Sequence, residues 1–459
     1  MKPWKTRAFS SEVDTGSREE NASKQRNKSM TRFNRSCSYM RGCRAVVAAL
    51  AVAFVATDAK AGSAGPAAHS FSPERLAKVS DYVRNEIVTG KIPGAILLLQ
   101  QHGKPVYYEK FGVRDVATEL SMSADTIFRL YSMSKPITTV IAMMLVEEGK
   151  LALSDPVSKY IPAFAGMKVG VEKRGDEGKA TMTLAPLKRP VTIEDLMRHT
   201  AGLPYGYYGG GVVNTTYADA GLFNNDPDNA EFVARLAALP LAEQPGTQWD
   251  YGHSTDVLGR IIEVITGKSL FQVEKERLLG PLGMNETAFY VADHAKWPLI
   301  AEPMPKDRTI SPVAEVRDPR KPLRWESGGG GMVGTIGDYA RFSQMLLNGG
   351  SYDGRRYLKP ETIALMASDH IGPETGVVRD KNYYPGPNSG FGLGFAVRTS
   401  VPPNTSWPLG EYRWDGVGGT FFFIDPADDL FGIFMVQTPS QRGRIQQELK
   451  TLIYQAMGR

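Results

Sequence analysis

A serine followed three positions later by a lysine, Ser132 and Lys135, gives this chain its strongest chemical signal. The run 137–146 after them is almost entirely apolar and predicts a buried helix, which Gly149 is placed to end. Residues three apart share one face of a helix, so the lysine amine can reach the serine hydroxyl. A serine hydroxyl is a weak nucleophile that needs such an adjacent base. The pair is therefore a candidate nucleophile with a potential base beside it.

Four further segments give this common pattern its weight, because serine and lysine at this spacing occur often by chance. They contain aromatic, histidine and glycine residues with related spacing and stand in a fixed order along the chain. These segments are 199–203, 245–259, 327–333 and 414–420. Within them, Tyr251 offers a second group that could take a proton, and we expect His199 to be a structural hydrogen-bonding residue rather than a base.

With these five motifs, residues 70–459 resemble the serine hydrolases of the β-lactamase fold, the penicillin-recognising superfamily. More closely, they resemble the family VIII carboxylesterases, which are related to class C β-lactamases. The resemblance implies Ser132 as the nucleophile and Lys135 and Tyr251 as its catalytic partners, and it leaves open which of the two is the general base. It also implies an oxyanion hole formed by the backbone N–H groups of Ser132 and Val417.

The candidate substrate-binding residues are Tyr131, His253, Trp414, Asp415 and Gly416. His253 stands where β-lactamases have an asparagine that contacts the substrate amide. Trp414 to Gly416 stand where these esterases commonly have W-G-G and β-lactamases have K-T-G. A β-lactam carries a carboxylate, for which the K-T-G lysine is the natural partner. Trp414 has no charge and Asp415 would repel that carboxylate, so we expect a neutral short-chain ester as the substrate.

Three alternatives remain open. A β-lactamase or DD-peptidase would need a cation near Trp414, and the adjacent Arg413 is expected to point away from it by strand alternation. Acyl transfer to an alcohol is possible because any nucleophile that enters can resolve an acyl-enzyme. A non-catalytic ligand sensor would not need the intact Ser132, Lys135 and Tyr251. The aromatic, glycine-rich run 205–211 either lines a pocket or forms a plain surface loop.

Charge and cysteine placement separate the first 61 residues from the rest. The chain has a formal net charge of +5, but residues 1–61 hold 12 Lys or Arg and 5 Asp or Glu, which leaves 42 basic and 44 acidic residues. The remainder gives no support for nucleic-acid binding. Both cysteines, Cys37 and Cys43, lie in the first part, so the rest has neither a disulfide nor a thiol ligand. The six histidines show no metal-ligand spacing, and we expect no metal and no cofactor.

The first 61 residues are predicted to be a leader with a signal peptide. A positive segment, 40–44, precedes an apolar run, 45–57, and the A-x-A pattern ending at Ala61 predicts cleavage there. The apolar run has 13 residues, short of the ~20 that span a bilayer, although an uncleaved anchor is the alternative. We therefore expect a periplasmic or secreted enzyme with a small-molecule ester as its partner, no membrane contact after cleavage, and an oligomeric state that the sequence leaves open.

Strand patterns near both ends, with helical patterns between them, predict an α+β fold of the β-lactamase/DD-peptidase type. The strand-like runs are 95–101, 105–112, 418–425 and 430–437. Local hairpins favour an antiparallel sheet, built here from N- and C-terminal segments and flanked by helices. We expect a sheet-containing domain of residues 62–125 and 325–459, a mainly helical domain of residues 126–324, and the active site at their interface.

Overall fold

The computed structural model describes residues 69–174, 180–311 and 314–459, which belong to one compact unit. The predicted leader and its cleavage site lie outside the described residues. Within the described ranges, no helix has the length and apolar character needed to cross a membrane, and no group of three or more His, Cys, Asp or Glu is arranged to hold a metal ion.

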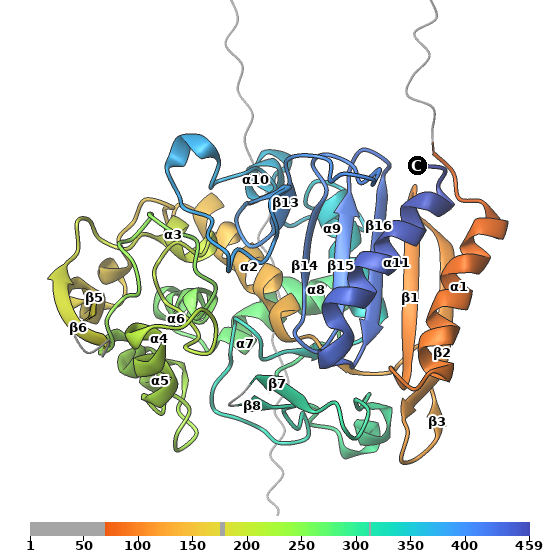
Figure 1. The fold of residues 1–459 in the computed structure, drawn as a ribbon, viewed down its shortest axis with the longest axis horizontal. Helices are drawn as coiled ribbons and strands as arrows, with labels where there is room; N and C mark the ends of the chain where they lie inside the picture. The colour runs from red at the N-terminus through yellow and green to blue at the C-terminus, as the bar shows by residue number, and fades with distance from the viewer. Residues whose placement is uncertain (1–68, 175–179, 312–313) are drawn as a thin grey trace, which may run out of the picture. The chain divides into compact units, whose positions relative to one another are not determined.

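An eight-stranded antiparallel sheet forms the centre of the described part (Figure 1). The N- and C-terminal segments meet where β1 pairs with β16, with Leu98 opposite Ile433. This confirms the predicted fold class. In spatial order the strands are β12 (Ser389–Phe391), β13 (Ala396–Arg398), β14 (Tyr412–Asp415), β15 (Phe421–Asp425), β16 (Leu430–Val436), β1 (Gly94–Gln101), β2 (Lys104–Asp115) and β3 (Leu120–Ser121).

Both faces of the sheet are covered, because alternate side chains of a strand point to opposite faces. Leu97 and Leu99 of β1 lie in a core shared with α1 (Pro73–Val88) and α11 (Arg442–Ala456), which lie side by side on one face (Figure 1). Ile96 and Leu98 lie in the larger core on the other face, with α2 (Ser134–Glu147) and α9 (Ile336–Leu347). The strand is therefore apolar at almost every position, unlike the half-buried strands that show simple alternation.

The segment between the two parts of the sheet is mainly helical. Its longest helix after α2 is α6 (Ser254–Thr266), whose buried apolar side chains recur at 257, 258, 261 and 262, and which ends at Gly267 in the left-handed conformation. The remaining α-helices are α3 (Ile193–Met197), α4 (Val212–Asp219), α5 (Asn229–Ala237), α7 (Leu270–Glu274), α8 (Gly280–Leu282) and α10 (Pro360–Met366).

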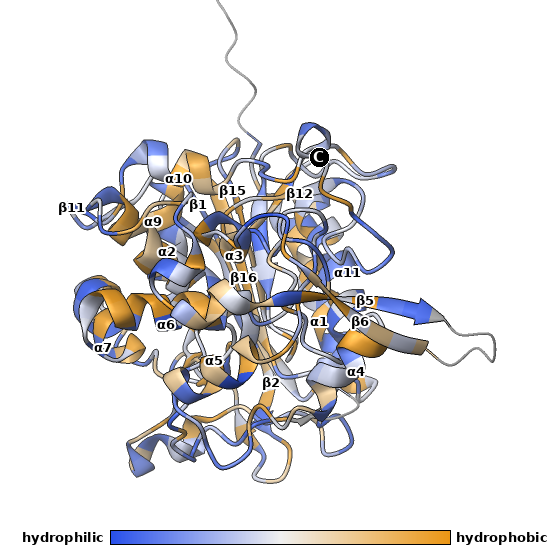
Figure 2. Cartoon of the chain, turned by 90° about the vertical axis from the view of Figure 1, so that its left-hand side faces the viewer, coloured by the Kyte–Doolittle hydropathy of each residue, from blue (hydrophilic) through white to orange (hydrophobic). Residues whose placement is uncertain are grey.

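A two-stranded hairpin, β5 (Lys168–Arg174) and β6 (Ala180–Pro186), is an element that the sequence did not predict. It projects from the body of the molecule (Figure 2), and the side chains of Val171 and Leu184 are exposed. A strand exposed on both faces has little hydrophobic alternation, so periodicity does not reveal it. Three further short pairs are β4 (Phe128–Arg129) with β9 (Val333–Gly334), β7 (Thr309–Ser311) with β8 (Ala314–Glu315), and β10 (Ser351–Tyr352) with β11 (Arg355–Arg356).

Candidate active site

Ser132 lies in a single turn of 3₁₀ helix, Tyr131–Met133, that leads directly into the buried α2. Tyr131 has a φ of 47°, a left-handed conformation that costs a residue with a Cβ about 1–3 kcal/mol. Its ring packs against Gly418, where an added Cβ would lie 2.7 Å from a ring carbon. The strained turn leaves the Ser132 side chain at the wall of a cavity, while α2 behind it remains in the core.

The Lys135 amine is buried beside the Ser132 hydroxyl. Its Nζ lies 3.2 Å from Ser132 Oγ and 2.9 Å from the Tyr205 hydroxyl, and it donates to the Gly329 carbonyl at 2.6 Å. Burial lowers the pKa of Lys135 to about 7, although the charges of nearby carboxylates act in the opposite direction. A large fraction of this amine is therefore neutral near pH 7 and able to accept a proton.

The Tyr251 hydroxyl is the second group beside Ser132. It is hydrogen-bonded with Ser132, and Trp414 Nε1 donates to it at 3.2 Å. The Lys135 Nζ lies 4.6 Å from the centre of the Tyr251 ring. Burial raises the pKa of Tyr251 well above 10, so the phenol keeps its proton near neutral pH. The structure thus brings the three residues predicted for catalysis together.

Asp256, which sequence reasoning missed, fixes the loop that holds Lys135. Its Oδ1 accepts from Ser327 Oγ at 2.6 Å and from the Gly329 N–H at 3.1 Å, and its Oδ2 lies 3.4 Å from His253 Nδ1. Burial alone raises the pKa of Asp256, but His253, Lys135 and Ser327 together bring it below the usual range. An added Cβ on Gly329 would lie 2.7 Å from the Asp256 carboxylate, so only glycine fits there. The signal in the sequence that could have identified Asp256 was its position in the first turn of α6, the helix that follows Tyr251.

The run 205–211 lines the cavity, which settles the question that the sequence left open. Tyr205 stacks on Tyr207 with ring centres 5.3 Å apart and meets the ring of His253 edge-on at 4.7 Å. Burial raises the pKa of Tyr205 well above 10, so its hydroxyl is a neutral hydrogen-bond partner for Lys135. The glycines of this run gave no hint that one of its tyrosines would reach the lysine, because that contact joins positions 70 apart in sequence.

The cavity at Ser132 has a volume of about 400 Å³. Aromatic side chains form much of its wall, together with several polar groups, which is the composition of a small-molecule site. Among the predicted residues, Tyr131, His253, Asp415 and Val417 line it, whereas Trp414 lies behind Tyr251 and Gly416 lies in the adjoining turn, where its N–H donates to Thr420. Other lining residues are Tyr205, Tyr207, Tyr208, Phe223, Trp325, Tyr384 and Arg442.

The charge of Asp415 differs from the sequence-based expectation. Its carboxylate pairs with Arg442 Nε at 2.9 Å and accepts from Gln446 at 2.8 Å. Because the Arg442 charge offsets that of Asp415, the prediction that Asp415 repels a substrate carboxylate is wrong. Arg413 does not line the cavity at Ser132, and its guanidinium donates to the Pro385 carbonyl and to Ser389 Oγ.

The expectation for His199 is also wrong. Neither ring nitrogen has a hydrogen-bond partner among the described residues. The ring instead packs against Tyr251 at 4.8 Å and Phe391 at 5.5 Å between centres. Burial, with the nearby charge of Lys135, lowers the pKa of His199 well below 6.5. His199 therefore supports the Tyr251 ring as a neutral packing residue.

Comparison with known proteins agrees with this geometry. Residues 77–455 match the family model described as Beta-lactamase. The chain is 35% identical over 365 residues to Protein Rv1367c of Mycobacterium tuberculosis, covering 77% of this chain and 88% of that protein. It is 28% identical over 400 residues to Esterase EstB of Burkholderia gladioli, covering 82% and 94%. Among solved structures, EstCE1, a hydrolase with promiscuous acyltransferase activity, gives a TM-score of 0.68 at 27% identity and covers 84% of this chain and 98% of its own.

Proposed function

The chain belongs to the beta-lactamase family, and we propose that within it this hydrolase is a serine carboxylesterase acting on short-chain esters. One observation carries the proposal: the Ser132 hydroxyl lies 3.2 Å from a buried lysine amine whose pKa is lowered to about 7. Similarity to Esterase EstB and to the hydrolase EstCE1 supports the same reaction class.

In the proposed acylation step, Ser132 Oγ attacks the ester carbonyl carbon while its proton passes to Lys135 Nζ. The oxyanion would be held by the backbone N–H groups of Ser132 and Val417, where each lost donor costs about 10²–10³ in rate. The Tyr251 phenol gives its proton to the departing alkoxide and regains one from the Lys135 ammonium. The alcohol leaves, and an acyl group remains on Ser132.

Deacylation again uses Lys135 as the base, with a water molecule as the nucleophile. A water molecule gives a proton to the neutral Lys135 amine and attacks the acyl carbonyl. The second tetrahedral intermediate collapses to release the carboxylic acid, and Ser132 Oγ recovers its proton from the Lys135 ammonium. Ser132, Lys135 and Tyr251 end each cycle in their starting protonation states, as catalysis requires.

Acyl transfer to an alcohol is the second candidate. The aromatic wall formed by Tyr207, Phe223 and Trp325 suits an apolar acceptor, and EstCE1 is described as a hydrolase with acyltransferase activity. An alcohol that enters before water would attack the same acyl-Ser132 ester. The two outcomes are separated by product analysis: an added alcohol gives a new ester only if transfer occurs.

The test compares hydrolysis of p-nitrophenyl butyrate with hydrolysis of a chromogenic cephalosporin by the full chain. We expect fast ester and slow cephalosporin turnover, both lost by a factor of about 10⁶ in Ser132→Ala. Ser121→Ala, at an exposed serine of β3, is the matched control and should retain full activity. Faster cephalosporin than ester turnover would instead identify a β-lactamase. Ester turnover that persists in Ser132→Ala would refute the assignment of the nucleophile.

We also propose that the enzyme is exported, with its leader removed after Ala61. The support is the order of a positive segment, an apolar run and an A-x-A pattern within residues 40–61. N-terminal sequencing of the protein from the periplasmic or extracellular fraction should begin at Gly62. A protein found only inside the cell with an intact leader would contradict this.

A further inference from the structure

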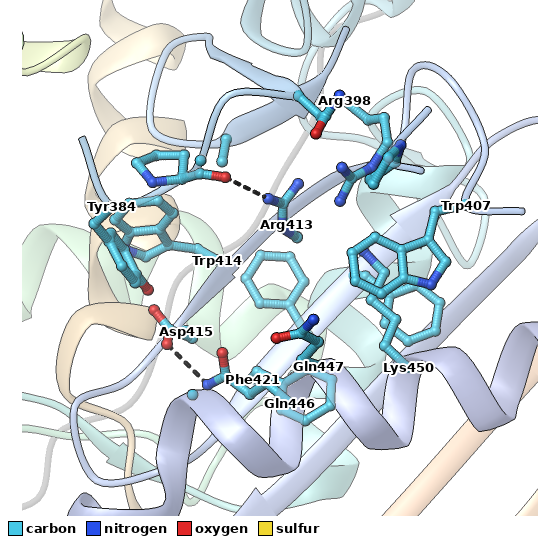
Figure 3. A pocket seen from close by; sticks show the side chains of 18 of the residues that line it. Tyr384, Arg398, Trp407, Arg413, Trp414, Asp415, Phe421, Gln446, Gln447 and Lys450 are labelled. Atoms are coloured by element: carbon cyan, nitrogen blue, oxygen red, sulfur yellow. Dashed lines mark hydrogen bonds between the residues drawn. The ribbon is translucent and has the colours of Figure 1, made fainter. Parts of the chain in front are cut away.

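A second cavity, of about 440 Å³, lies between α11 and strands β13, β14 and β15 (Figure 3). Its wall includes Phe421 and Phe423, which belong to the core on the α11 face of the sheet, whereas α2 lies in the core on the other face. Tyr384 and Asp415 line both cavities. The proposed ester hydrolysis makes no use of this second cavity.

Three basic side chains gather around one buried carboxylate at one end of the second cavity. Arg398 Nη2 and Arg413 Nη1 lie 3.6 Å and 3.5 Å from Glu411 Oε1, and Lys450 Nζ donates to the same oxygen. The Glu411 side chain is 0% exposed, and the Tyr454 hydroxyl donates to its other oxygen. Burial lowers the pKa of Lys450 well below 10.5, but the two arginines alone carry more positive charge than Glu411 offsets. Such a buried excess is unfavourable without a further anion.

Two N–H donors in this cluster, Arg398 Nε and Trp407 Nε1, are buried and have no partner among the described residues. Arg398 Nη2 and Arg413 Nη1 share one oxygen of Glu411 with Lys450, at ion-pair distances of 3.6 Å and 3.5 Å. The Arg398 side chain is only 2% exposed, so solvent does not replace the missing acceptors freely. Buried donors are nearly always hydrogen-bonded in proteins, so two without a partner beside an over-shared carboxylate point to a ligand that supplies acceptor atoms.

The geometry of Arg398 narrows the class of ligand. Its Nε and Nη2 lie on one edge of the planar guanidinium, and that edge donates two parallel hydrogen bonds to a carboxylate. The guanidinium lies 4.8 Å from the centre of the Trp407 ring, which holds it in place, and Lys450 Nζ lies 4.4 Å from the same ring. Burial and the neighbouring Arg413 lower the pKa of Arg398 to about 10, so it is still cationic at neutral pH.

Figure 3 shows the two ends of the cavity. Arg398, Trp407 and Lys450 lie at one end, and Tyr384 and Asp415 lie at the other. Asp415 is already paired with Arg442 and carries no free charge into the cavity. The space between the ends is bordered by aromatic rings, so a ligand needs one anionic group and an apolar body, a combination that inorganic phosphate lacks.

We propose that the second cavity binds a small organic carboxylate, with the carboxylate at the Nε–Nη2 edge of Arg398 and the apolar body against Trp407, Phe421 and Phe423. The carboxylic acid released by the proposed esterase belongs to this class of ligand. The site itself does not depend on Ser132 chemistry, and it holds whether or not the esterase proposal is correct.

The test is calorimetric titration of the full chain with 3-phenylpropionate. We expect one binding site, no binding of the neutral 3-phenylpropionamide, and affinity at least about tenfold weaker in Arg398→Gln, which loses a charged bidentate donor. Trp407→Phe keeps an aromatic ring but removes the Nε1–H donor, and it should weaken binding as well. Arg355→Gln, at an exposed arginine, is the matched control and should bind like the wild type. Circular dichroism melting reports whether each variant is folded.

A variant of the other cavity separates the two sites. Phe223→Ala changes the wall at Ser132 and should leave 3-phenylpropionate affinity unchanged. The proposal is overturned if the wild type does not bind, if folded Arg398→Gln and Trp407→Phe both bind as tightly as wild type, or if the amide binds equally well. It is also overturned if affinity is lost in Phe223→Ala but not in Arg398→Gln, because the ligand would then occupy the Ser132 cavity.

Discussion

The titration of Lys135 predicts how the rate depends on pH. Its pKa is about 7, against an ordinary value of 10.5, because burial, partly offset by nearby carboxylates, disfavours the ammonium by a net of about 5 kcal/mol relative to water. Only the neutral amine can accept the Ser132 proton. We therefore expect kcat/KM to rise with pH up to about 7 and then to level off. About one tenth of the amine is neutral at pH 6 and about one hundredth at pH 5, so the rate at pH 5 should be about 100-fold below the plateau.

The assay is kcat/KM for p-nitrophenyl butyrate between about pH 5 and pH 9 at constant ionic strength, followed at the isosbestic wavelength of the product. Lys135→Met removes the base and should lower kcat/KM by about 10²–10⁴, with loss of the rise near pH 7. Lys150→Met is the matched control, because that lysine side chain is 59% exposed, and its profile should equal the wild type's.

Three results would refute this reasoning. A profile that is flat from about pH 5 to pH 9 would show that no group with a pKa near 7 accepts the proton. A rate that is still rising steeply at about pH 9 would point to an unperturbed amine or to Tyr251. Full activity in Lys135→Met would show that the lysine is not the base, whatever its pKa.

Three further predictions concern groups around this centre and one buried pair elsewhere. Tyr205→Phe removes the hydroxyl that contacts Lys135 and should lower kcat/KM about tenfold without a large change in melting temperature; an unchanged rate would deny that hydroxyl a role. Asp256→Asn removes a charge that raises the pKa of Lys135, so the rise in the pH profile should move to lower pH, and a move to higher pH would contradict the assigned interaction. Glu243 and Asp250 are hydrogen-bonded carboxyls, and burial together with their mutual repulsion raises the pKa of Glu243. A raised carboxyl pKa gives stability that is fully present below the ordinary pKa of 4.5 and is lost as pH rises to the folded-state pKa of about 9. The melting temperature should therefore fall over this pH range, and less so in Glu243→Gln. Melting temperatures that stay constant in the wild type would exclude this effect.

Four strand runs near the two ends of the chain and the proposed nucleophile, Ser132, were predictable because both leave local patterns. The runs 95–101 and 430–437 are apolar at almost every position, since they are covered on both faces, and they became β1 and β16. The hairpin β5–β6 left no such pattern, because its side chains are largely exposed. Hydrophobic periodicity reports burial. It therefore detects a strand with one buried face or a strand buried on both faces, but not a strand exposed on both faces.

Contacts between distant segments were not predictable. The approach of Tyr205 to Lys135 joins residues 70 apart, and the pairing of Arg442 with Asp415 joins a helix to the end of a strand. The prediction that Asp415 gives the cavity a repulsive negative charge was wrong for this reason, since its partner, Arg442, follows it by 27 positions. His199 was misjudged in a similar way, because only packing shows that aromatic rings surround it.

The sequence by itself determined the proposed nucleophile, its two proposed partners and an antiparallel sheet built from both ends of the chain, because helix periodicity, strand composition and the motif order are local properties. The tertiary structure alone decided the electrostatics. Burial lowers the pKa of Lys135, Asp256 fixes the loop that holds it, and Arg442 offsets Asp415. These effects depend on how much solvent each charge loses and which groups surround it, and both follow from the packing of segments that lie far apart in the chain.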